Sequence, residues 1–205
     1  ILSDVNLSIG KGELVYLIGR TGTGKSSLIK LLYGDLPLIQ GQGKVVGFNL
    51  KKLNDDKIPL LRRKLGVVFQ DFKLLSDRNV YDNLAFVLKA TGWTDKAKIK
   101  QRIGEVLTKV KMETKDFKFP HELSGGEQQR VSVARALINQ PDVVFADEPS
   151  GNLDSESAEH LHQLFFQLRK EFNQTFVIVT HNEELAAMAD RKLVMVDGKI
   201  ISKLA

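Results

Sequence analysis

Residues 14–27 read Leu-Val-Tyr-Leu-Ile-Gly-Arg-Thr-Gly-Thr-Gly-Lys-Ser-Ser, and this stretch decides the fold. The apolar run over 14–18 predicts a short buried strand that ends at Gly19. Residues 19–26 then fit the phosphate-binding loop pattern, in which Gly and four further residues precede Gly-Lys-Ser. Residues 27–32 predict a helix directly afterwards. A strand, this loop and a helix in that order predict an α/β domain that binds a nucleotide phosphate.

The residue types in this loop suit both phosphate and magnesium. Glycines let backbone N–H groups turn towards phosphate oxygens, and the N-terminus of the following helix adds positive potential. Lys25 is expected to reach the β- and γ-phosphates, and the Ser26 hydroxyl is expected to ligate Mg²⁺. A glycine-rich turn without a ligand is the alternative, which the flanking strand and helix disfavour. The expected nucleotide-binding residues are Gly19, Arg20, Thr21, Gly22, Thr23, Gly24, Lys25, Ser26 and Ser27.

Three further apolar runs are each followed by a polar residue. The runs cover 67–69, 143–146 and 176–179, and the residues that follow them are Gln70, Asp147 and Thr180. Because ligands of open α/β sheets bind beyond the carboxyl ends of the strands, these positions indicate one shared site. The alternation of strand-like and helix-like segments favours a largely parallel sheet.

Two adjacent carboxylates follow the run over 143–146. After a phosphate-binding loop, Asp147 is expected to hold the water shell of Mg²⁺. Glu148 is then placed to polarise the attacking water as a general base. An acidic pair that caps a strand at the surface is the alternative.

The middle of the chain has a helical periodicity instead. From about residue 79 to 139, and again over 161–172, apolar residues recur at helical spacing. An all-helical stretch between two strand-bearing regions predicts an insertion into the α/β core. Of the histidines outside the motifs, we interpret His121, His160 and His162 as structural, and we place the latter two on an exposed helix.

Residues 123–130, Leu-Ser-Gly-Gly-Glu-Gln-Gln-Arg, mark the start of a helix that runs to Asn139. Ser124 and Glu127 fit a capping box, which explains these two residues but not the glycines between them. Exposed N–H groups of Gly125 and Gly126 at a helix N-terminus form a second phosphate site. One nucleotide does not need two such sites. The pattern therefore predicts two chains related by a two-fold axis, each completing the other's site.

Composition narrows the class further. The chain has 205 residues, 42% of them apolar and 27% charged, which is typical of one globular domain. The absence of cysteine excludes disulfides, thiolate metal sites and cysteine nucleophiles. A solvated surface explains the net charge of +5 as well as an anionic partner does. No apolar run is long enough for a transmembrane helix, and a chain that starts at Ile1 is expected to have a further N-terminal segment.

Taken together, the motifs resemble an ABC-type ATPase subunit over essentially the whole chain. The resemblance implies a mainly parallel P-loop core, a small antiparallel β subdomain and an inserted helical subdomain. It implies a single domain over 1–205, with the core at about 1–70 and 140–205 and the helices at about 71–139. ATP and Mg²⁺ are the implied cofactors. The implied signature, which acts on the partner's ATP, comprises Leu123, Ser124, Gly125, Gly126, Glu127 and Gln128.

The resemblance also assigns roles to other residues. Gln70 corresponds to a glutamine that contacts Mg²⁺ and couples to a membrane subunit, and His181 to a catalytic histidine that contacts the γ-phosphate. The segment that crosses the dimer interface, or D-loop, is implied at Ser150, Gly151, Asn152, Leu153 and Asp154. Members of the family stack adenine on an aromatic residue just upstream of the position of Ile1, and we expect that residue in the missing N-terminal segment.

The spacing of the motifs resembles the branch that contains the cell-division ATPase FtsE, the lipoprotein-releasing ATPase LolD and the MacB-type exporters. The front half, at 33–37, 69–75 and 81–83, is most similar to the cell-division type, whereas 148–152 and 181–185 are more similar to the lipoprotein-releasing type. Both processes stay open. The resemblance implies a homodimer on the cytoplasmic face of the cell membrane that drives a separate integral membrane subunit, with no nucleic acid. The apolar residues expected to contact that subunit, unless they pack internally, are Phe72, Leu74 and Leu75.

Two other classes share the phosphate-binding loop. Nucleic-acid-associated ABC proteins carry long coiled coils or tandem ATPase units, and 205 residues hold neither. A GTPase needs an Asn-Lys-x-Asp guanine reader, which the sequence lacks. Neither a GTPase nor a small-molecule kinase explains residues 123–128, so the ATPase is the favoured reading.

Overall fold

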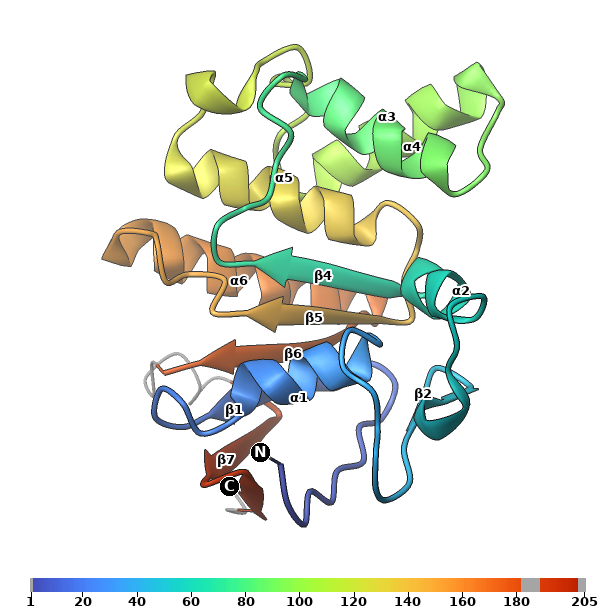
Figure 1. Cartoon of the computed structure of the whole chain (residues 1–205). Coiled ribbons are helices and arrows are strands. Elements are labelled where there is room, and N and C mark those ends of the chain that lie inside the picture. Colours follow the sequence, from blue (N-terminus) through green and yellow to red (C-terminus); the bar gives the residue numbers. More distant parts are fainter. Residues whose placement is uncertain (1, 182–188, 203–205) are drawn as a thin grey trace.

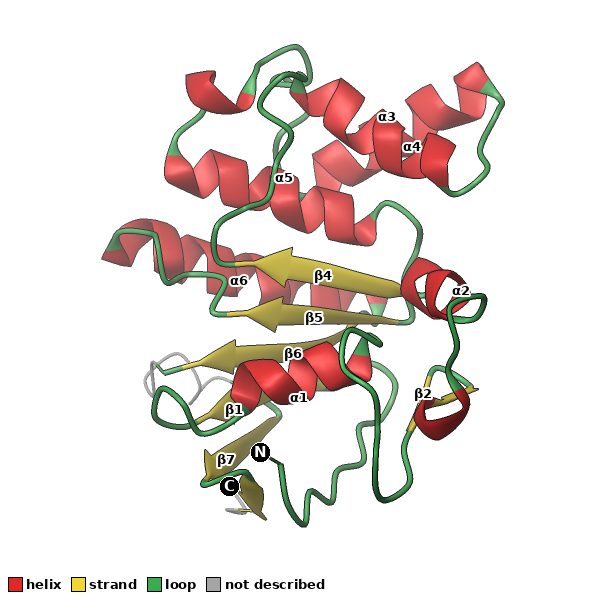
Figure 2. Ribbon diagram, viewed as in Figure 1, coloured by secondary structure: helices red, strands yellow, loops and turns green. Residues whose placement is uncertain are grey.

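The computed structural model describes residues 2–181 and 189–202, so residues 182–185 of the back-half pattern lie outside the described residues. Its strands are β1 (Leu14–Ile18), β2 (Lys44–Val45), β3 (Phe48–Asn49), β4 (Leu65–Phe69), β5 (Val143–Asp147), β6 (Thr175–Thr180), β7 (Arg191–Val196) and β8 (Lys199–Ser202). The main sheet has six strands in the order β4-β5-β6-β1-β7-β8. The first five in that order are parallel, and β8 pairs antiparallel with β7. β2 and β3 form a separate small antiparallel sheet, so the mixed fold expected from the sequence is confirmed (Figure 2).

The helices are α1 (Lys25–Leu32), α2 (Ile58–Arg63), α3 (Val80–Ala90), α4 (Lys96–Lys109), α5 (Gly125–Leu137) and α6 (Ser155–Phe172), with short 3₁₀ turns at η1 (Leu50–Lys52) and η2 (Pro120–Glu122). Four of these helices begin at a polar residue whose side chain accepts a hydrogen bond from a backbone N–H of the first turn. Such N–H groups have no acceptor within the helix, so the cap satisfies them. These caps are Asn79, Asp95, Ser124 and Asp154.

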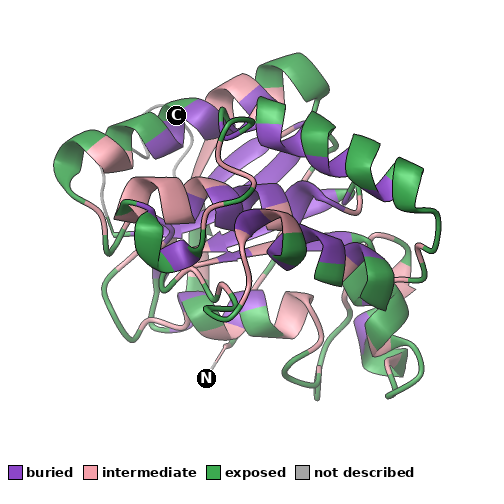
Figure 3. Cartoon of the chain, turned by 90° about the horizontal axis from the view of Figure 1, so that it is seen from above, coloured by how far each residue is buried: buried purple, intermediate pink, exposed green. Residues whose placement is uncertain are grey.

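The helices form layers on both faces of the sheet because successive strand residues point to opposite sides. Val15 and Leu17 of β1 pack in one core with α1 and α2, whereas Leu14 and Tyr16 pack in the other with α3 to α6. Figure 1 shows α5 over β4, with α3 and α4 beyond α5 at the top of the molecule. Figure 3, viewed from above, shows buried residues along the strands and exposed residues on the outer turns of the helices.

The structure confirms the main elements predicted from the sequence and moves some bounds. The runs at 14–18, 67–69, 143–146 and 176–179 all lie in parallel strands, and the helical middle contains α3, α4 and α5. β7 and β8 escaped the sequence analysis because basic and polar residues interrupt their apolar pattern. The placement of His162 on an exposed helix is wrong, since this side chain is fully buried on the inner face of α6. None of the helices in 2–181 and 189–202 is long and apolar enough to cross a membrane.

Candidate nucleotide site

The predicted site residues gather at one edge of the sheet because the strands are in register there. Ile18 is paired with Thr180, Val179 with Asp147, and Asp147 with Phe69. The next residue of each strand's chain therefore leaves the sheet at the same edge. α1 and α5 both begin at this edge, on opposite faces of the sheet (Figure 1).

The phosphate-binding loop leads directly into α1. Gly24 precedes the helix with φ 104°, a left-handed conformation that glycine adopts without steric penalty. No side chain of the described residues caps α1, so the N–H groups of its first turn stay available. Nζ of Lys25 donates to the carbonyl oxygens of Gly19 at 2.6 Å and Arg20 at 3.0 Å. The buried lysine thus lies inside the loop, as the motif predicts.

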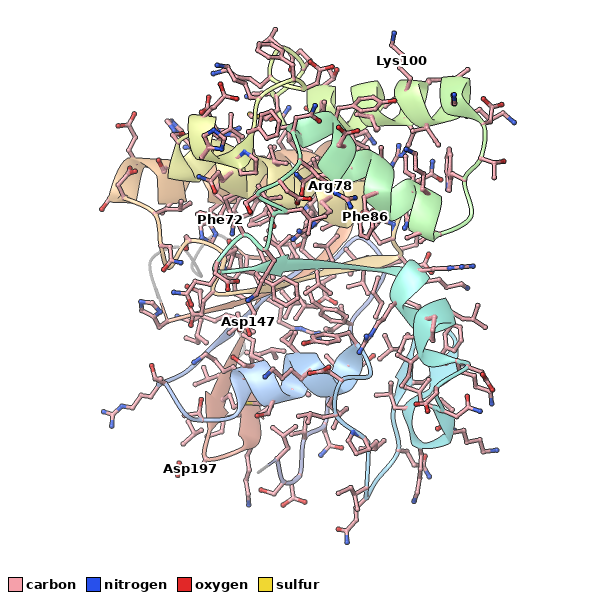
Figure 4. The ribbon with its side chains drawn as sticks, turned by 45° about the horizontal axis from the view of Figure 1, so that its top comes forward. Phe72, Arg78, Phe86, Lys100, Asp147 and Asp197 are labelled. Atoms are coloured by element: carbon pink, nitrogen blue, oxygen red, sulfur yellow. The ribbon has the colours of Figure 1, made fainter. Side chains whose placement is uncertain are left out.

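Ser26 and Asp147 meet across the sheet edge although they are far apart in sequence. The Ser26 hydroxyl donates to Oδ1 of Asp147 at 3.0 Å, and Figure 4 shows Asp147 beside the start of α1. Burial raises the pKa of Asp147, while the hydrogen bond from Ser26 and the charges of Lys25 and Lys30 oppose that rise. Hydroxyl and carboxylate oxygens are the hard donors that Mg²⁺ prefers, so this pair fits a magnesium ion.

Glu148 turns away from the strand and contacts His181. Its φ of 47° is uncommon for a residue other than glycine, and its N–H donates to the carbonyl of Val179 at 3.0 Å. Oε2 lies 3.0 Å from Nδ1 of His181 and accepts the backbone N–H of the same residue at 3.3 Å. The structure therefore brings together the two residues predicted to be catalytic.

Gln70 lies against the predicted D-loop. Its Nε2 donates to Oδ1 of Asn152 at 3.0 Å, and Nδ2 of Asn152 donates back to the Gln70 carbonyl at 3.2 Å. A Cβ on Gly151 would come within 2.7 Å of Nε2 of Gln70, so a larger residue there would displace the glutamine side chain. Gln70 is engaged with this loop and not with Ser26 and Asp147, and its role as a Mg²⁺ ligand stays a prediction.

The start of α5 has the predicted capping box. Ser124 accepts from the Glu127 N–H at 3.3 Å, and Glu127 accepts from the Ser124 N–H at 2.9 Å. The other carboxylate oxygen of Glu127 accepts from Nζ of Lys115 at 2.7 Å, and this hydrogen bond is the main reason that the pKa of Glu127 is lowered. Gln128 donates to the carbonyl of Leu123 at 3.2 Å, which closes the segment on itself.

The two glycines of this segment face the start of α6. A Cβ on Gly126 would lie 3.1 Å from Oγ of Ser157, and one on Gly125 would lie 3.5 Å from Leu153. Close approach to α6 therefore gives Gly126 a structural reason that the sequence analysis did not identify. Asp154 completes this contact region, because it caps α6 and accepts from both the N–H and the hydroxyl of Ser157 at 2.8 Å.

The structure adds buried polar residues that the sequence analysis did not assign to the site. Gln129 is fully buried, and its Nε2 donates to the carbonyls of Phe69 at 3.1 Å and of Pro149. His162 contacts Ser150 and the hydroxyl of Tyr16. Gln129 lies within the motif at 123–130, but no signal in the sequence links His162 to the site. Tyr16 is fully buried and offers no surface for stacking adenine.

Of the apolar residues after Gln70, one packs inside the protein and two are at least partly accessible at the surface. Leu74 packs against the core, whereas Leu75 is 36% exposed and Phe72 is half-buried. Figure 4 shows Phe72 on the segment between β4 and α3, with Arg78 beside Phe86 further on. The Arg78 guanidinium lies 4.5 Å from the centre of the exposed Phe86 ring.

Comparison with known proteins agrees with this geometry. The family model described as "ABC transporter" matches residues 2–151. The cell-division ATP-binding protein FtsE of Streptococcus pneumoniae is 40% identical over 201 residues, covering 98% of this chain and 86% of that protein. The lipoprotein-releasing system ATP-binding protein LolD of Cytophaga hutchinsonii is 44% identical over 203 residues, covering 98% and 92%.

Solved structures show the same fold. The dimeric structure of MJ0796, a bacterial ABC transporter cassette, has a TM-score of 0.86 at 34% identity and covers 97% of this chain and 88% of that chain. The same cassette in a post-hydrolysis state bound to ADP and Pi has a TM-score of 0.84 at 33% identity, with the same coverage. The expected family, fold and reaction type are therefore confirmed: the chain belongs to the ABC transporter family, as an ATP-binding subunit of its ATP-hydrolysing kind.

Proposed function

We propose that the edge formed by the phosphate-binding loop, β5 and β6 binds ATP with Mg²⁺ and hydrolyses it inside a sandwich of two copies of this chain. The observation that carries the proposal is the contact between Ser26 and Asp147 at 3.0 Å, beside an uncapped helix start. It supports one position at which phosphate and Mg²⁺ are held together. Residues 19–27 form the nucleotide cradle in this proposal.

Ser26 and Asp147 hold the magnesium ion, and Gln70 reaches it after leaving Asn152. The ion, when bound, neutralises the charge that develops on the β- and γ-phosphate oxygens. Lys25 adds a positive charge: its Nζ, which donates to two carbonyls of the loop, turns to a phosphate oxygen when the nucleotide binds. The first-turn N–H groups of α1 complete the cradle.

Glu148 acts as the general base, and His181 orients it and contacts the γ-phosphate. The contact of 3.0 Å between Oε2 of Glu148 and Nδ1 of His181 supports this assignment. A carboxylate held in this way can accept the proton of a water molecule that attacks along the axis of the phosphate chain. Lys25, Ser26 and Asp147 hold the nucleotide and take no part in this proton transfer.

The test of the general base is Glu148→Gln, which keeps the size of the side chain and removes its basicity. Hydrolysis should fall by about 10²–10⁴-fold, while ATP binding persists. With Mg-ATP this variant should accumulate as a dimer of twice 22.9 kDa in size-exclusion chromatography with light scattering, but not with ADP. Turnover of Glu148→Gln at the rate of the unaltered chain would overturn the assignment.

The second copy supplies residues 123–128 and the D-loop 150–154 to the nucleotide of the first. Support comes from the placement of α1 and α5 at the same edge but on opposite faces of the sheet. The solved MJ0796 cassette is described as dimeric, and its fold matches this chain. A Glu148→Gln protein that is inactive yet never dimerises with ATP would count against the sandwich and leave the base assignment in place.

The membrane subunit docks in a groove beside the free edge of β4. The groove has a volume of about 340 Å³ and lies between α2, α3 and α5. Strand β4 is the outer strand of its sheet, and the groove is lined by Arg62, Arg63, Gly66, Val67, Val87 and Arg135. We propose that residues 71–139 form a helical subdomain against the core of 1–70 and 140–205, and that the groove lies between the subdomain and the core. The arginines of the groove then bind an acidic cytoplasmic segment of an integral membrane subunit. The chain is then peripheral on the inner face of the cell membrane.

Charge reversal tests this docking site. Arg63→Glu should reduce the fraction of the chain retained on membranes of the source cell, because exposed Arg63 has no ion pair in the described part of the chain. Lys100→Glu is the matched control, since Lys100 is exposed on α4 away from the groove (Figure 4). Equal retention of both variants would contradict the docking site.

A further inference from the structure

A buried polar chain connects the strand before the phosphate-binding loop with the D-loop. The hydroxyl of Tyr16 in β1 contacts Nδ1 of His162 in α6. Nε2 of the same imidazole lies 3.2 Å from Oγ of Ser150, the first residue of the D-loop. Tyr16 and His162 are both 0% exposed. Residues from three separate parts of the chain therefore form one continuous hydrogen-bonded path.

The direction of this path follows from the donors and acceptors that are present. Among the described residues, His162 is the one hydrogen-bonding partner recorded for the Tyr16 hydroxyl. A buried hydroxyl without an acceptor is costly, so Tyr16 donates its proton to Nδ1 of His162. The neutral imidazole then carries its proton on Nε2 and donates to Oγ of Ser150. Tyr16 thereby determines which histidine nitrogen faces the D-loop.

Ser150 lies in the backbone turn that connects Glu148 with the D-loop, so a hydrogen bond to its side chain can fix this turn. The N–H of Gly151 donates to the carbonyl of Glu148 at 3.0 Å, and the N–H of Leu153 donates to that of Ser150 at 3.1 Å. Glu148 itself has the uncommon φ of 47°. Displacement of Ser150 would therefore move the turn that presents Glu148 on one side and the D-loop on the other.

We propose that His162 is a positioning residue for hydrolysis, which acts through Ser150 to hold the turn between Glu148 and the D-loop. Tyr16 sets the tautomer of His162 for this task. The inference rests on the proposed roles of Glu148 and the D-loop. Because β1 leads into the phosphate-binding loop, the path ties the nucleotide cradle to the segment that reaches the second copy.

Packing alone does not account for the histidine. Its ring stacks on Tyr16 at 5.5 Å between centroids and meets Phe165 edge-on at 6.0 Å. A phenylalanine or leucine would fill that space, but it would leave the Tyr16 hydroxyl without an acceptor and Ser150 without a donor. The polar ring is therefore explained by its hydrogen bonds to Tyr16 and Ser150.

Kinetics of three variants test the role. Ser150→Ala, Tyr16→Phe and His162→Phe should each lower kcat for ATP about tenfold, while KM changes less than about twofold, because misplaced catalytic groups reduce turnover without loss of substrate binding. The double variant Tyr16→Phe/Ser150→Ala should lose no more than the worse single variant, since the two changes break one path. Ser150→Thr keeps the hydroxyl and should recover most of the activity.

The matched control is His160→Ala, which removes a histidine from the exposed face of the same helix. It should keep the kcat of the unaltered chain. Thermal unfolding of every variant separates a loss of folded protein from a loss of turnover. If His162→Phe does not fold, Ser150→Ala still tests the proposal, because it removes one hydroxyl from a half-buried position. A Ser150→Ala protein with unchanged kcat would overturn the inference.

The tautomer gives a readout that does not depend on nucleotide or on Glu148. Nitrogen-15 NMR of the histidine rings should show His162 with its proton on Nε2, and Tyr16→Phe should reduce the population of that tautomer. A proton on Nδ1 in the unaltered chain would overturn the inference. If Glu148→Gln stayed active while the tautomer was as expected and Ser150→Ala was slow, the general-base assignment would fail and the positioning role would stand.

Discussion

Two helices start at the same edge of the molecule with glycine-rich sequence, yet their first turns are satisfied differently. α1 follows Gly24 and has no side-chain cap in the described chain. α5 follows Ser124, and the reciprocal bonds of Ser124 and Glu127 satisfy two of its N-terminal donors. Orphan donors at a helix start need an acceptor from elsewhere. The first-turn donors of α1 are therefore left to solvent or a ligand, whereas the α5 start is partly self-sufficient.

The surroundings of the two starts differ in the same way. Lys25, Ser26 and Asp147 surround the first turn of α1 with groups that suit phosphate and magnesium. The first turn of α5 packs against Ser157 and Leu153 at the start of α6. Under the proposed function, the nucleotide of one copy lies at the start of α1. The start of α5, which packs against α6, would then meet the nucleotide of a second copy.

The largest effect that sharpens this contrast is expected for Lys25→Ala. Loss of a charge-assisted donor to the β- and γ-phosphates should weaken ATP binding by at least about 10²-fold and abolish turnover. Isothermal calorimetry of the single chain measures the affinity. Unchanged affinity would mean that α1 is not the phosphate site. Lys100→Ala is the control, because Lys100 is exposed on α4, away from the loop (Figure 4).

Ser124→Arg should have nearly as large an effect on turnover, but not on binding. The long cationic side chain fills the space meant for the partner's γ-phosphate, so hydrolysis should drop by at least about 10²-fold. ATP affinity of the single chain should stay within about twofold. Ser124→Ala removes the cap without filling that space, and its hydrolysis should fall far less. Normal turnover of Ser124→Arg would leave the start of α5 with its capping role alone.

A smaller effect, on stability, is expected from His162, which is fully buried in α6. Burial lowers its pKa to about 4 from 6.5. As the pH falls from 6.5 towards 4, the imidazole of His162 becomes protonated in the unfolded chain but stays neutral in the folded chain. The free energy of unfolding therefore decreases over that pH range. Between about pH 7 and about pH 5, the free energy of unfolding should fall by about 2 kcal/mol more in the unaltered chain than in His162→Phe.

Urea unfolding at the two pH values measures this difference. His160→Ala serves again as the control, because it removes an exposed histidine of the same helix and should leave the pH dependence nearly unchanged. Parallel losses in the unaltered chain and in His162→Phe would show that the imidazole is not held neutral in the folded state.

The smallest expected effect concerns the cap of α5. Glu127→Ala should lower the free energy of unfolding by about 1 kcal/mol, because it opens the capping box and frees Lys115. Glu127→Gln keeps the reciprocal hydrogen bond, since glutamine also serves at this position, and should lose less. Thermal or urea unfolding distinguishes the two. Equal stability of Glu127→Ala and the unaltered chain would mean that the α5 start is not self-sufficient after all.

Much of the site was predictable because its motifs are short in sequence. The loop over 19–26 contains its own glycines, lysine and serine, so adjacency alone indicates how they act. The capping box of Ser124 and Glu127 is likewise a relation between residues three positions apart. The polar residues after β4, β5 and β6 could be assigned to one edge because parallel strands end on the same side. The missed β7 shows the limit, since its apolar pattern is broken by Arg191 and Lys192.

Other features depend on contacts between distant residues. Gln70 and Asn152 are 82 positions apart, and Tyr16 and His162 are 146 apart. Whether such residues meet depends on strand order, on register and on which face of α6 turns inward. A period of 3.6 residues locates the apolar face of a helix, but it does not show that a histidine on that face has a buried tyrosine and a loop serine as partners. The surroundings of Gly126 are also of this kind.

The sequence by itself determined the phosphate-binding loop, its following helix, the carboxylate pair after β5 and the capped start of α5. Each of these rests on backbone preferences and hydrogen bonds among near neighbours in the chain. Only the tertiary structure decided that Ser26 meets Asp147, that Glu148 meets His181 and that a buried histidine ties β1 to the D-loop. Those contacts form when strands from separate segments of the chain align side by side. The free energy of burial depends on the apolar area removed from water, and not on how far apart two residues lie in the sequence.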